Sequence, residues 1–359
     1  MKIITNYLPQ FHCIPENDKY WGKGFTDWVS CKQAKPLFEG HLQPKVPLDN
    51  NYYSLDNPES VKWQIDLANK YDVYGFGIYH YWFHSGLNLL TKPVEIILNH
   101  PEYNINYFFI WDNNLWRKTW SALTGGASWN GKDEDHKTET MAELRYGDES
   151  EWKAHFEFLL PFFKDTRYIK QDGKPIFAIF KTYQTFDVLE KMEKYWNKLA
   201  IENGFKGIQL ISRADYKQPQ FEKSFVYTPF AATTIPDYIS FKARSIIVKD
   251  KVKKFSYDKM WKNILKRSVQ LRPNTILSGF VNFDDTPRRG NNGKVVVGAT
   301  PEKFNYYLRQ LLKIADDKGQ DFIMLTAWNE WGEGCYLEPD EVNKYQYLEA
   351  LKDALENYK

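Results

Sequence analysis

The feature that most constrains the fold is an alternation of short apolar runs with amphipathic stretches, which continues along the whole chain. Short apolar runs bounded by polar residues are typical of buried strands, and the stretches between them have helical periodicity. The predicted strands are Lys2–Tyr7, Val73–Tyr81, Asn106–Trp111, Pro175–Phe180, Ile208–Ser212, Ser224–Tyr227, Thr275–Phe280 and Phe322–Ala327.

The clearest predicted helices lie between these strands or follow the last one, at Pro58–Lys70, Trp152–Phe163, Thr185–Glu202, Pro301–Asp317 and Tyr345–Asn357. Thr300 and Pro301 are the residue types expected at the N-cap and first position of a helix. Strands that alternate with helices pair in parallel, because each crossover uses a helix. We therefore expect an α/β protein in which residues 1–359 form a single (β/α)8 barrel.

Two connections exceed the usual length of a loop between a strand and the next helix. Residues 8–57 follow the first strand and residues 112–150 follow the third. Such long loops usually carry function. The sixth unit is the least regular, because residues 213–256 mix Pro, Lys and aromatic residues without clear periodicity.

Composition favours a globular protein with an aromatic-rich interior. Hydrophobic residues make up 43% of the chain, and aromatic residues 17%. Most of these rings belong to a core, but aromatic side chains also stack on sugar rings in binding clefts. The net charge of +2 and the lack of a long basic run argue against a nucleic-acid partner.

The cysteines and the apolar runs bear on the compartment. Cys13, Cys31 and Cys335 are odd in number and widely spaced, so a disulfide framework is not indicated. The N-terminal residues lack the apolar region of a secretory signal, and no run reaches the roughly 20 apolar residues of a membrane span. We therefore expect a cytoplasmic protein without a transmembrane segment.

In a barrel of this type, functional side chains come from the carboxyl ends of the strands and the loops after them. After the eighth strand, TAWNEWGEG carries two glutamates, Glu330 and Glu333, next to Trp328 and Trp331. Glycoside chemistry uses one carboxylic acid as proton donor and one carboxylate as base or nucleophile. The alternative is that both glutamates are merely charged residues on a surface loop. Their position at a strand end and their aromatic neighbours favour a catalytic pair instead.

The same rule selects further candidates for substrate binding. They are Tyr7, His12, His80, Tyr81, Trp82, Trp111, Asn113, Asp284, Arg288, Asn329 and Trp331.

Three other patterns favour a structural interpretation. His80 and His84 have the spacing of metal ligands on a helix, but a strand end is expected here, so we predict no metal site. The acidic run of Asp133, Glu134 and Asp135 is more typical of a solvated turn than of a cation site in a nucleotide-sugar transferase. Cys335 is more typical of a small buried residue than of a nucleophile.

Several motifs together resemble a known family. They are NYLPQFHCIPENDKYWGKGFTDW, PLFEGHLQP, GFGIYHYWF, DDTPRRG and WNEWGEGCYLEP, which run from residue 6 to residue 339. They are similar to the bacterial WbsX family of polysaccharide-locus proteins, which is related to the endo-α-mannosidases of glycoside hydrolase family 99.

This resemblance implies a (β/α)8 barrel that acts on an oligosaccharide or polysaccharide without a cofactor. It implies that Glu330 deprotonates the sugar's own 2-hydroxyl, giving a 1,2-anhydro intermediate with retention, while Glu333 is acid and then base. Two positions depart from the pattern. Gly332 stands where the mannosidases usually carry His, and Asn114 stands where WbsX relatives carry an acidic residue.

Three functions remain open from the sequence. The first is a glycoside hydrolase-like enzyme that cleaves or rearranges an internal α-linkage. The second is a glycosyltransferase of surface-polysaccharide assembly, although the glycine-rich phosphate loop of a doubly wound fold is missing. The third is a glycan-binding barrel without catalysis, which has no need for two closely spaced carboxylates.

Overall fold

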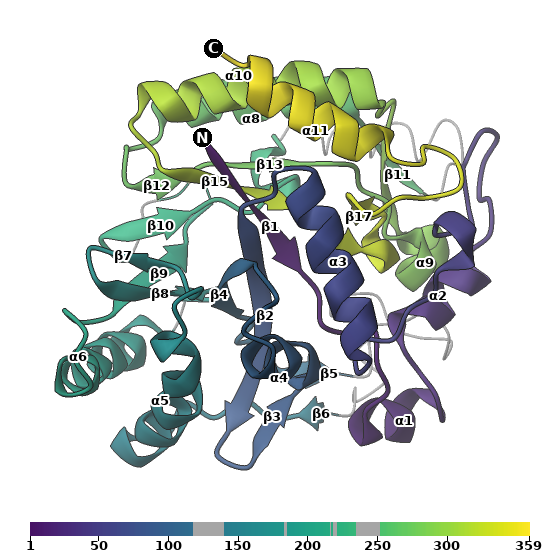
Figure 1. Ribbon diagram of the computed structural model, residues 1–359. Helices are drawn as coiled ribbons and strands as arrows, with labels where there is room; N and C mark the ends of the chain where they lie inside the picture. Colours follow the sequence, from purple (N-terminus) through teal and green to yellow (C-terminus); the bar gives the residue numbers. More distant parts are fainter. Residues whose placement is uncertain (118–139, 183–184, 216, 218–220, 235–251) are drawn as a thin grey trace.

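A sheet of parallel strands curls into a barrel at the centre of the protein (Figure 1). The computed structural model describes residues 1–117, 140–182, 185–215, 217, 221–234 and 252–359. In the order of the sheet from β1, the strands are β1 (Lys2–Tyr7), β2 (Gly75–His84), β4 (Asn106–Trp111), β8 (Lys174–Ile179), β9 (Gln209–Arg213) and β10 (Lys223–Phe225). On its other side β1 pairs with β15 (Phe322–Thr326).

The predicted seventh strand closes this sheet. It divides at Leu277 into β12 (Thr275–Ile276) and β13 (Ser278–Phe280). β12 pairs in parallel with β10, whereas β13 pairs in parallel with β15. One short segment of chain therefore joins both edges of the sheet, and the predicted barrel is confirmed.

Helices cover the outside of the barrel. They are α3 (Pro58–Lys70), α4 (Lys92–Asn99), α5 (Glu149–Lys164), α6 (Phe186–Glu202), α8 (Tyr257–Gln270), α10 (Pro301–Asp317) and α11 (Gln346–Asn357). The side chain of Thr300 accepts a hydrogen bond from the backbone of Lys303, as predicted for the N-cap of α10. α5 begins ahead of the predicted Trp152, because Asp148 provides its N-cap by accepting from Ser150.

The fifth unit departs from the regular alternation. Residues 214–222 alone connect β9 to β10, and the described part of this connection contains no helix. So short a segment is below the length of ordinary crossovers that include a helix. The barrel therefore keeps its predicted strands, and the described residues of this connection add no helix to the outer layer.

The core lies inside the barrel and between the barrel and its helices. Its largest fully buried side chains include Trp196, Trp261, Trp328 and Trp331, as expected from the aromatic composition. The chain ends meet on one side, where the amino group of Met1 donates to the hydroxyl of Tyr358 over 3.3 Å (Figure 1). In the described residues, no helix is both long enough and apolar enough to cross a membrane.

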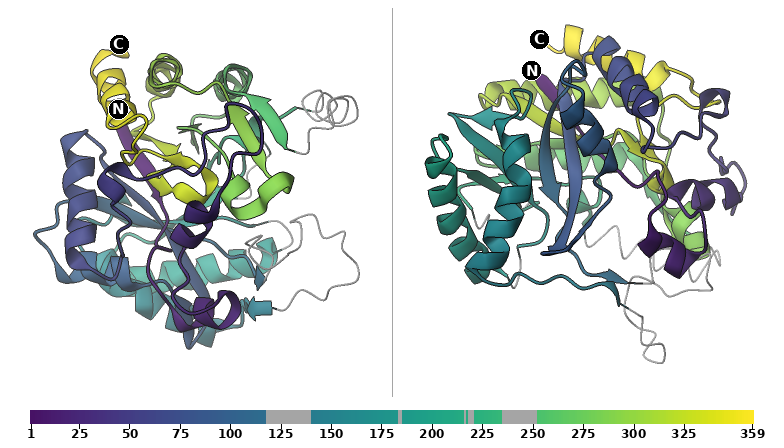
Figure 2. Two further views of the ribbon diagram at one scale, coloured as in Figure 1. Left: turned by 90° about the vertical axis from the view of Figure 1, so that its right-hand side faces the viewer. Right: turned by 60° about the horizontal axis from the view of Figure 1, so that its bottom comes forward.

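Short elements gather at the carboxyl ends of the strands (Figures 1 and 2). The long segment 8–57 forms α1 (Pro15–Trp21), α2 (Asp27–Gln33) and η1 (Leu48–Asn50). Next to α2 lie α9 (Thr286–Arg289) and the segment that follows β15, which forms β16 (Asn329–Glu330), η5 (Trp331–Glu333) and β17 (Cys335–Tyr336).

The remaining elements of the described chain are short. They are β3 (Leu87–Leu89), β5 (Trp116–Arg117), β6 (Thr140–Ala142), β7 (Lys170–Gln171), η3 (Phe230–Ala232), β11 (Lys253–Ser256), η4 (Gly290–Asn292) and β14 (Lys294–Val297).

Candidate active site

The two predicted catalytic glutamates lie on a tight hairpin after the eighth strand. β16 and β17 pair antiparallel, with Glu330 opposite Cys335. Gly334 reverses the chain in the left-handed conformation, with φ of 54°, which favours glycine. A Cβ atom at Gly334 would also lie 2.9 Å from the Cβ of Asp284. The turn therefore needs glycine both for its backbone conformation and for space.

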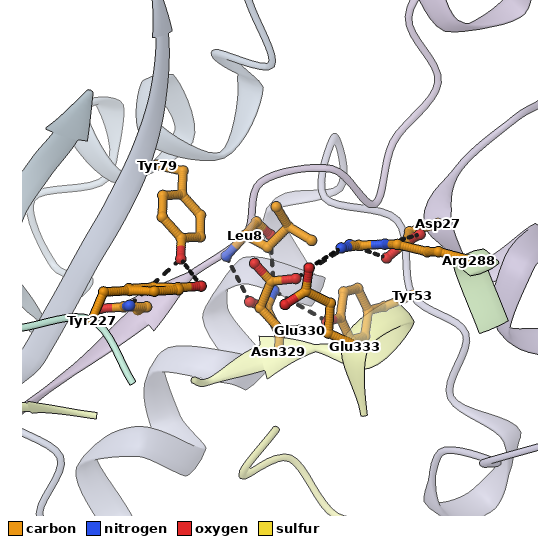
Figure 3. Close-up of polar contacts among 10 residues, drawn as sticks. Leu8, Asp27, Tyr53, Tyr79, Tyr227, Arg288, Asn329, Glu330 and Glu333 are labelled. Carbon is orange, nitrogen blue, oxygen red and sulfur yellow. Dashed lines mark hydrogen bonds and ion pairs between the residues drawn. The ribbon is translucent and has the colours of Figure 1, made fainter. Parts of the chain in front are cut away.

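Arg288 brings the two carboxyl groups together (Figure 3). Its Nη2 donates to Oε2 of Glu330 over 3.2 Å, and its Nη1 donates to Oε1 of Glu333 over 2.9 Å. Both carboxyl groups therefore bind one guanidinium. This arrangement keeps them well within the roughly 10 Å that paired carboxylates of glycoside chemistry span.

A third carboxylate binds the same guanidinium. Asp27, the first residue of α2, accepts from Nε of Arg288 over 3.2 Å and from Nη2 over 2.7 Å. Asp27 is 1% exposed and Arg288 is 4% exposed. Asp27 was not among the predicted site residues, and its place in the motif GFTDW offers no chemical signal for this contact.

The two glutamates lie in different environments. Glu330 is buried, whereas the side chain of Glu333 keeps 21% of its surface exposed. Burial raises the pKa of Glu330 well above its ordinary value, the neighbouring charge of Glu333 raises it further, and Arg288 opposes the shift. In the free protein, these effects favour the protonated form of Glu330.

Tyrosines lie on the other side of the glutamate pair from Arg288 (Figure 3). The hydroxyl of Tyr79 donates to that of Tyr227 over 2.9 Å. Burial raises the pKa of Tyr227, and the charges of Glu333 and Glu330 raise it further, so the phenol lies within electrostatic reach of both. Neither tyrosine was predicted, although Tyr79 shares a face of β2 with the predicted Tyr81 because strand side chains alternate.

The charges of the two glutamates also affect the pKa of two further side chains, Tyr81 and Asp112. Burial and the charges of Asp112 and Glu330 raise the pKa of Tyr81. Burial raises the pKa of Asp112 to about 6, with Asn114 and Arg213 opposing the shift and Glu333 adding to it. The ends of β2 and β4 therefore carry polar groups that lie near the glutamates.

Three predicted substrate-binding residues lie instead in the layer between the barrel and α5. The Nε2 atoms of His80 and His155 are 2.8 Å apart, and the ring of Trp82 stacks on His155. Trp111 also contacts His155, and its Nε1 donates to the carbonyl of Trp82. His80 and Trp82 alternate with Tyr79 and Tyr81 along β2, so they point to the opposite face.

Three more of the predicted residues bind protein groups in or near the hairpin and the first strand. The side chain of Asn329 accepts from the backbone N–H of Leu8 over 2.7 Å and donates to its carbonyl over 3.0 Å. Trp331 stacks on Tyr336 with ring centroids 3.7 Å apart. The hydroxyl of Tyr7 donates to Oε1 of Gln64 in α3 over 2.6 Å. All three are buried and bound to protein groups.

Two of the last three predicted residues join loops through hydrogen bonds. Asn113 binds the backbone of Lys181 through both its amide nitrogen and its oxygen. Asp284 accepts from His41 over 2.8 Å and from Gln43 over 2.7 Å, which ties segment 8–57 to the residues before α9. His12 is buried, and burial lowers its pKa.

Two histidines and an acidic run are also considered from the sequence as metal ligands, and Cys335 as a nucleophile. Within the described ranges, no three His, Cys, Asp or Glu side chains are grouped as a metal site requires. Nδ1 of His84 lies 2.7 Å from the carbonyl oxygen of Ser85, whereas His80 binds His155. Asp133, Glu134 and Asp135 lie outside the described residues. Cys335 is buried, and burial raises its pKa, which favours the unreactive thiol.

Comparisons with known proteins agree on a family and a fold. The model of a family described as glycosyltransferase WbsX matches residues 3–351. The uncharacterized protein WxcX of Xanthomonas campestris pv. campestris is 28% identical over 366 residues, which is 98% of this chain and 49% of that protein. The chain thus spans about half the length of the curated relatives that it matches.

Two solved structures share the fold. The glycoside hydrolase family 99 endo-α-mannosidase of Bacteroides thetaiotaomicron superposes with a TM-score of 0.58 at 15% identity, over 99% of this chain and 97% of that one. A glycoside hydrolase-like protein has a TM-score of 0.58 at 13% identity, over 98% and 93% of the two chains.

Proposed function

Because the chain belongs to the WbsX glycosyltransferase family, we propose that it is a carbohydrate-active enzyme that acts on glycosidic linkages of a bacterial surface polysaccharide. This is the family that the sequence motifs indicate. The barrel also has the fold of the endo-α-mannosidases, so an α-mannoside-like linkage is the first candidate substrate. Glu330 and Glu333 are its proposed catalytic pair.

One observation carries this proposal, which is that Arg288 bridges two glutamates at the end of the eighth strand. Acid-base catalysis needs two carboxyl groups with different proton affinities, and different surroundings create that difference. The burial of Glu330 and the partial exposure of Glu333 meet this requirement.

The proposed reaction follows the chemistry implied by the family resemblance. Glu330 takes the proton of the sugar's 2-hydroxyl, whose oxygen attacks the anomeric carbon while Glu333 protonates the departing oxygen. Glu333 then removes a proton from the acceptor, which opens the three-membered ring, and the 2-oxygen regains its proton from Glu330. A raised pKa makes the Glu330 carboxylate a stronger base. The two glutamates share one proton in this scheme, and Glu330 can act as base only when that proton lies on Glu333 as substrate binds.

The test compares wild type with Glu330→Gln and Glu333→Gln on α-mannosides, capsule fragments and sugar nucleotides. We expect each variant to lose about 10²- to 10⁴-fold in activity, which is the usual range for acid-base groups. Glu356→Gln, on the exposed side of α11, is the matched control and keeps wild-type activity. Equal activity of wild type and both site variants on every active substrate would refute the catalytic pair.

The two roles can be separated with aryl α-glycosides that carry an activated leaving group. Such a leaving group departs without a proton, so Glu333→Gln should recover the first step, measured as a rapid burst of released aryl alcohol, while Glu330→Gln should not. Recovery by Glu330→Gln alone would reverse the two assignments.

Transfer to a sugar acceptor is the second candidate, because the matching family is described as a glycosyltransferase. Reaction in ¹⁸O-labelled water separates the two functions. A hydrolase puts the label on the anomeric carbon of the product, whereas a transferase gives an unlabelled glycoside. A strict requirement for a sugar nucleotide would also exclude the hydrolase.

A further inference from the structure

The ion pair between Asp27 and Arg288 lies in the protein interior, next to Glu330 and Glu333. Its side chains are 2% and 4% exposed, and 261 positions of sequence separate them. Two nitrogens of one guanidinium bind the two oxygens of one carboxylate, which is the strongest and most directional form of this contact. Asp27 therefore determines the plane in which the guanidinium lies.

Gly332 leaves the space that this ion pair occupies. A Cβ atom at Gly332 would lie 2.3 Å from Oδ2 of Asp27 and 2.5 Å from Nε of Arg288, which is closer than real Cβ atoms approach other atoms. Gly332 lies between Glu330 and Glu333 in the sequence. Any other residue at position 332 would therefore displace the ion pair from the hairpin that carries the glutamates.

The charge on Arg288 is already shared among three carboxylates. Asp27, Glu330 and Glu333 all accept from it, and it is nearly inaccessible to solvent. Arg288, which the sequence selected for substrate binding, contacts both proposed catalytic groups. If all three carboxyl groups were ionised, they and the one guanidinium would have a net charge of −2 in a buried place. Because buried charge is costly, one of the carboxyl groups is favoured to keep a proton.

The described groups that face Glu330 come from several elements. They are Glu333 of η5, Arg288 of α9, Asp27 and Cys31 of α2, Tyr79 and Tyr81 of β2, Tyr227 after β10, and Cys335 of β17. Arg288 is the cation in this set, and Asp27 is the one carboxylate outside the hairpin.

We propose that Asp27 is a positioning residue, which holds the guanidinium of Arg288 between Glu330 and Glu333 and thereby determines which glutamate keeps their shared proton. The catalytic consequence of this arrangement rests on the proposed function. The arrangement itself is a property of the free protein and can be measured without a substrate.

The test follows the carboxyl carbons of ¹³C-labelled glutamates by NMR during a pH titration, with the Glu330 signal assigned by its loss in Glu330→Gln. Asp27→Asn removes a negative charge that raises the pKa of Glu330, while the carboxamide oxygen of Asn can still accept a hydrogen bond from Arg288 and keep the guanidinium in place. We expect the midpoint of Glu330 to fall by about one pH unit. Gly332→Ala keeps every charge but pushes the guanidinium away, so we expect the midpoint to rise.

The control is Asp165→Asn, which alters another Asp–Arg pair, the one with Arg167 at 2.6 Å. It should leave the Glu330 midpoint unchanged. Opposite shifts in Asp27→Asn and Gly332→Ala support the proposal. An unchanged midpoint in either variant, or shifts of the same sign in both, overturns it.

Activity assays separate this proposal from the proposed function. If the midpoints shift as expected while Glu330→Gln remains fully active, the ion pair positions the glutamates but the catalytic role is wrong. If Glu330→Gln is inactive and the midpoints do not shift, the catalytic pair stands without positioning by Asp27. On an active substrate, the acidic limb of the kcat/KM profile should move with the Glu330 midpoint.

Discussion

At the scale of single residues, Glu338 joins the hairpin to neighbouring elements through buried hydrogen bonds. Its carboxylate accepts from the hydroxyl of Tyr53 over 2.8 Å, from Gln64 over 2.7 Å and from Nε1 of Trp331 over 2.6 Å. These contacts join the hairpin to segment 8–57 and to α3. Burial raises the pKa of Glu338 to about 7, although the three donors oppose the shift.

This raised pKa predicts a pH dependence of stability. The folded state holds the proton up to about pH 7, whereas the unfolded chain releases it near pH 4.5, so Glu338 makes the protein less stable as pH rises through this window. Glu338→Gln cannot ionise. Between pH 5 and pH 8, the variant should gain about 2–3 kcal/mol in free energy of unfolding relative to wild type. Urea denaturation at both pH values measures it, and a constant difference would contradict the prediction.

At the scale of elements, segment 8–57 is joined to the loop before α9 through one side chain. Asp284 accepts from His41 and Gln43, and its backbone N–H donates to the carbonyl of Glu333 over 2.6 Å. One residue thus links the first long loop to the hairpin of the glutamates.

Loss of this link should loosen the loop. Asp284→Ala leaves the buried donors of His41 and Gln43 without their acceptor, and we expect a loss of about 3 kcal/mol in free energy of unfolding. Limited proteolysis should then cleave near residues 36–48 faster than in wild type. Asp66→Ala, which removes the exposed ion pair with Lys62, should change neither measurement. Unaltered proteolysis of Asp284→Ala would show that other contacts hold the loop.

At the scale of the whole molecule, the layer between the barrel and α5 contains two buried histidines. His80 and His155 bind each other among aromatic rings. Burial lowers the pKa of His80 to about 3, and burial together with His80 lowers that of His155. Both imidazoles therefore stay neutral while the protein is folded.

This predicts an acid-dependent loss of stability. The unfolded chain binds protons below about pH 6.5 and the folded protein does not, so stability falls as pH decreases from 6.5 towards 3. His155→Phe removes one of the two groups. Between pH 7 and pH 5, the variant should lose about 2 kcal/mol less than wild type, as measured by urea denaturation. An equal loss in the variant and in wild type over this interval would contradict the prediction.

Local periodicity was sufficient to predict the barrel. Strand runs such as Lys2–Tyr7 and Phe322–Ala327 are recognisable because parallel strands are buried on both faces, and their order follows from the crossovers. The division of Thr275–Phe280 and the short connection between β9 and β10 were not predictable, because both depend on how the last edges of the sheet meet.

The sequence by itself determined where the glutamates lie, since the eighth strand must end beside the hairpin that carries Glu330 and Glu333. It also selected Tyr81 and Arg288, although it did not predict the role of Arg288. It did not predict that His80 and Trp82 contact His155, because the phase of β2, and hence which side chains face α5, depends on packing against that helix.

Only the tertiary structure decided what surrounds the glutamates. Asp27 and Arg288 meet because α2 docks against α9, and no local pattern records a contact between residues 261 positions apart. Burial, which sets the proton affinity of Glu330, is likewise a property of the assembled barrel and not of the segment TAWNEWGEG.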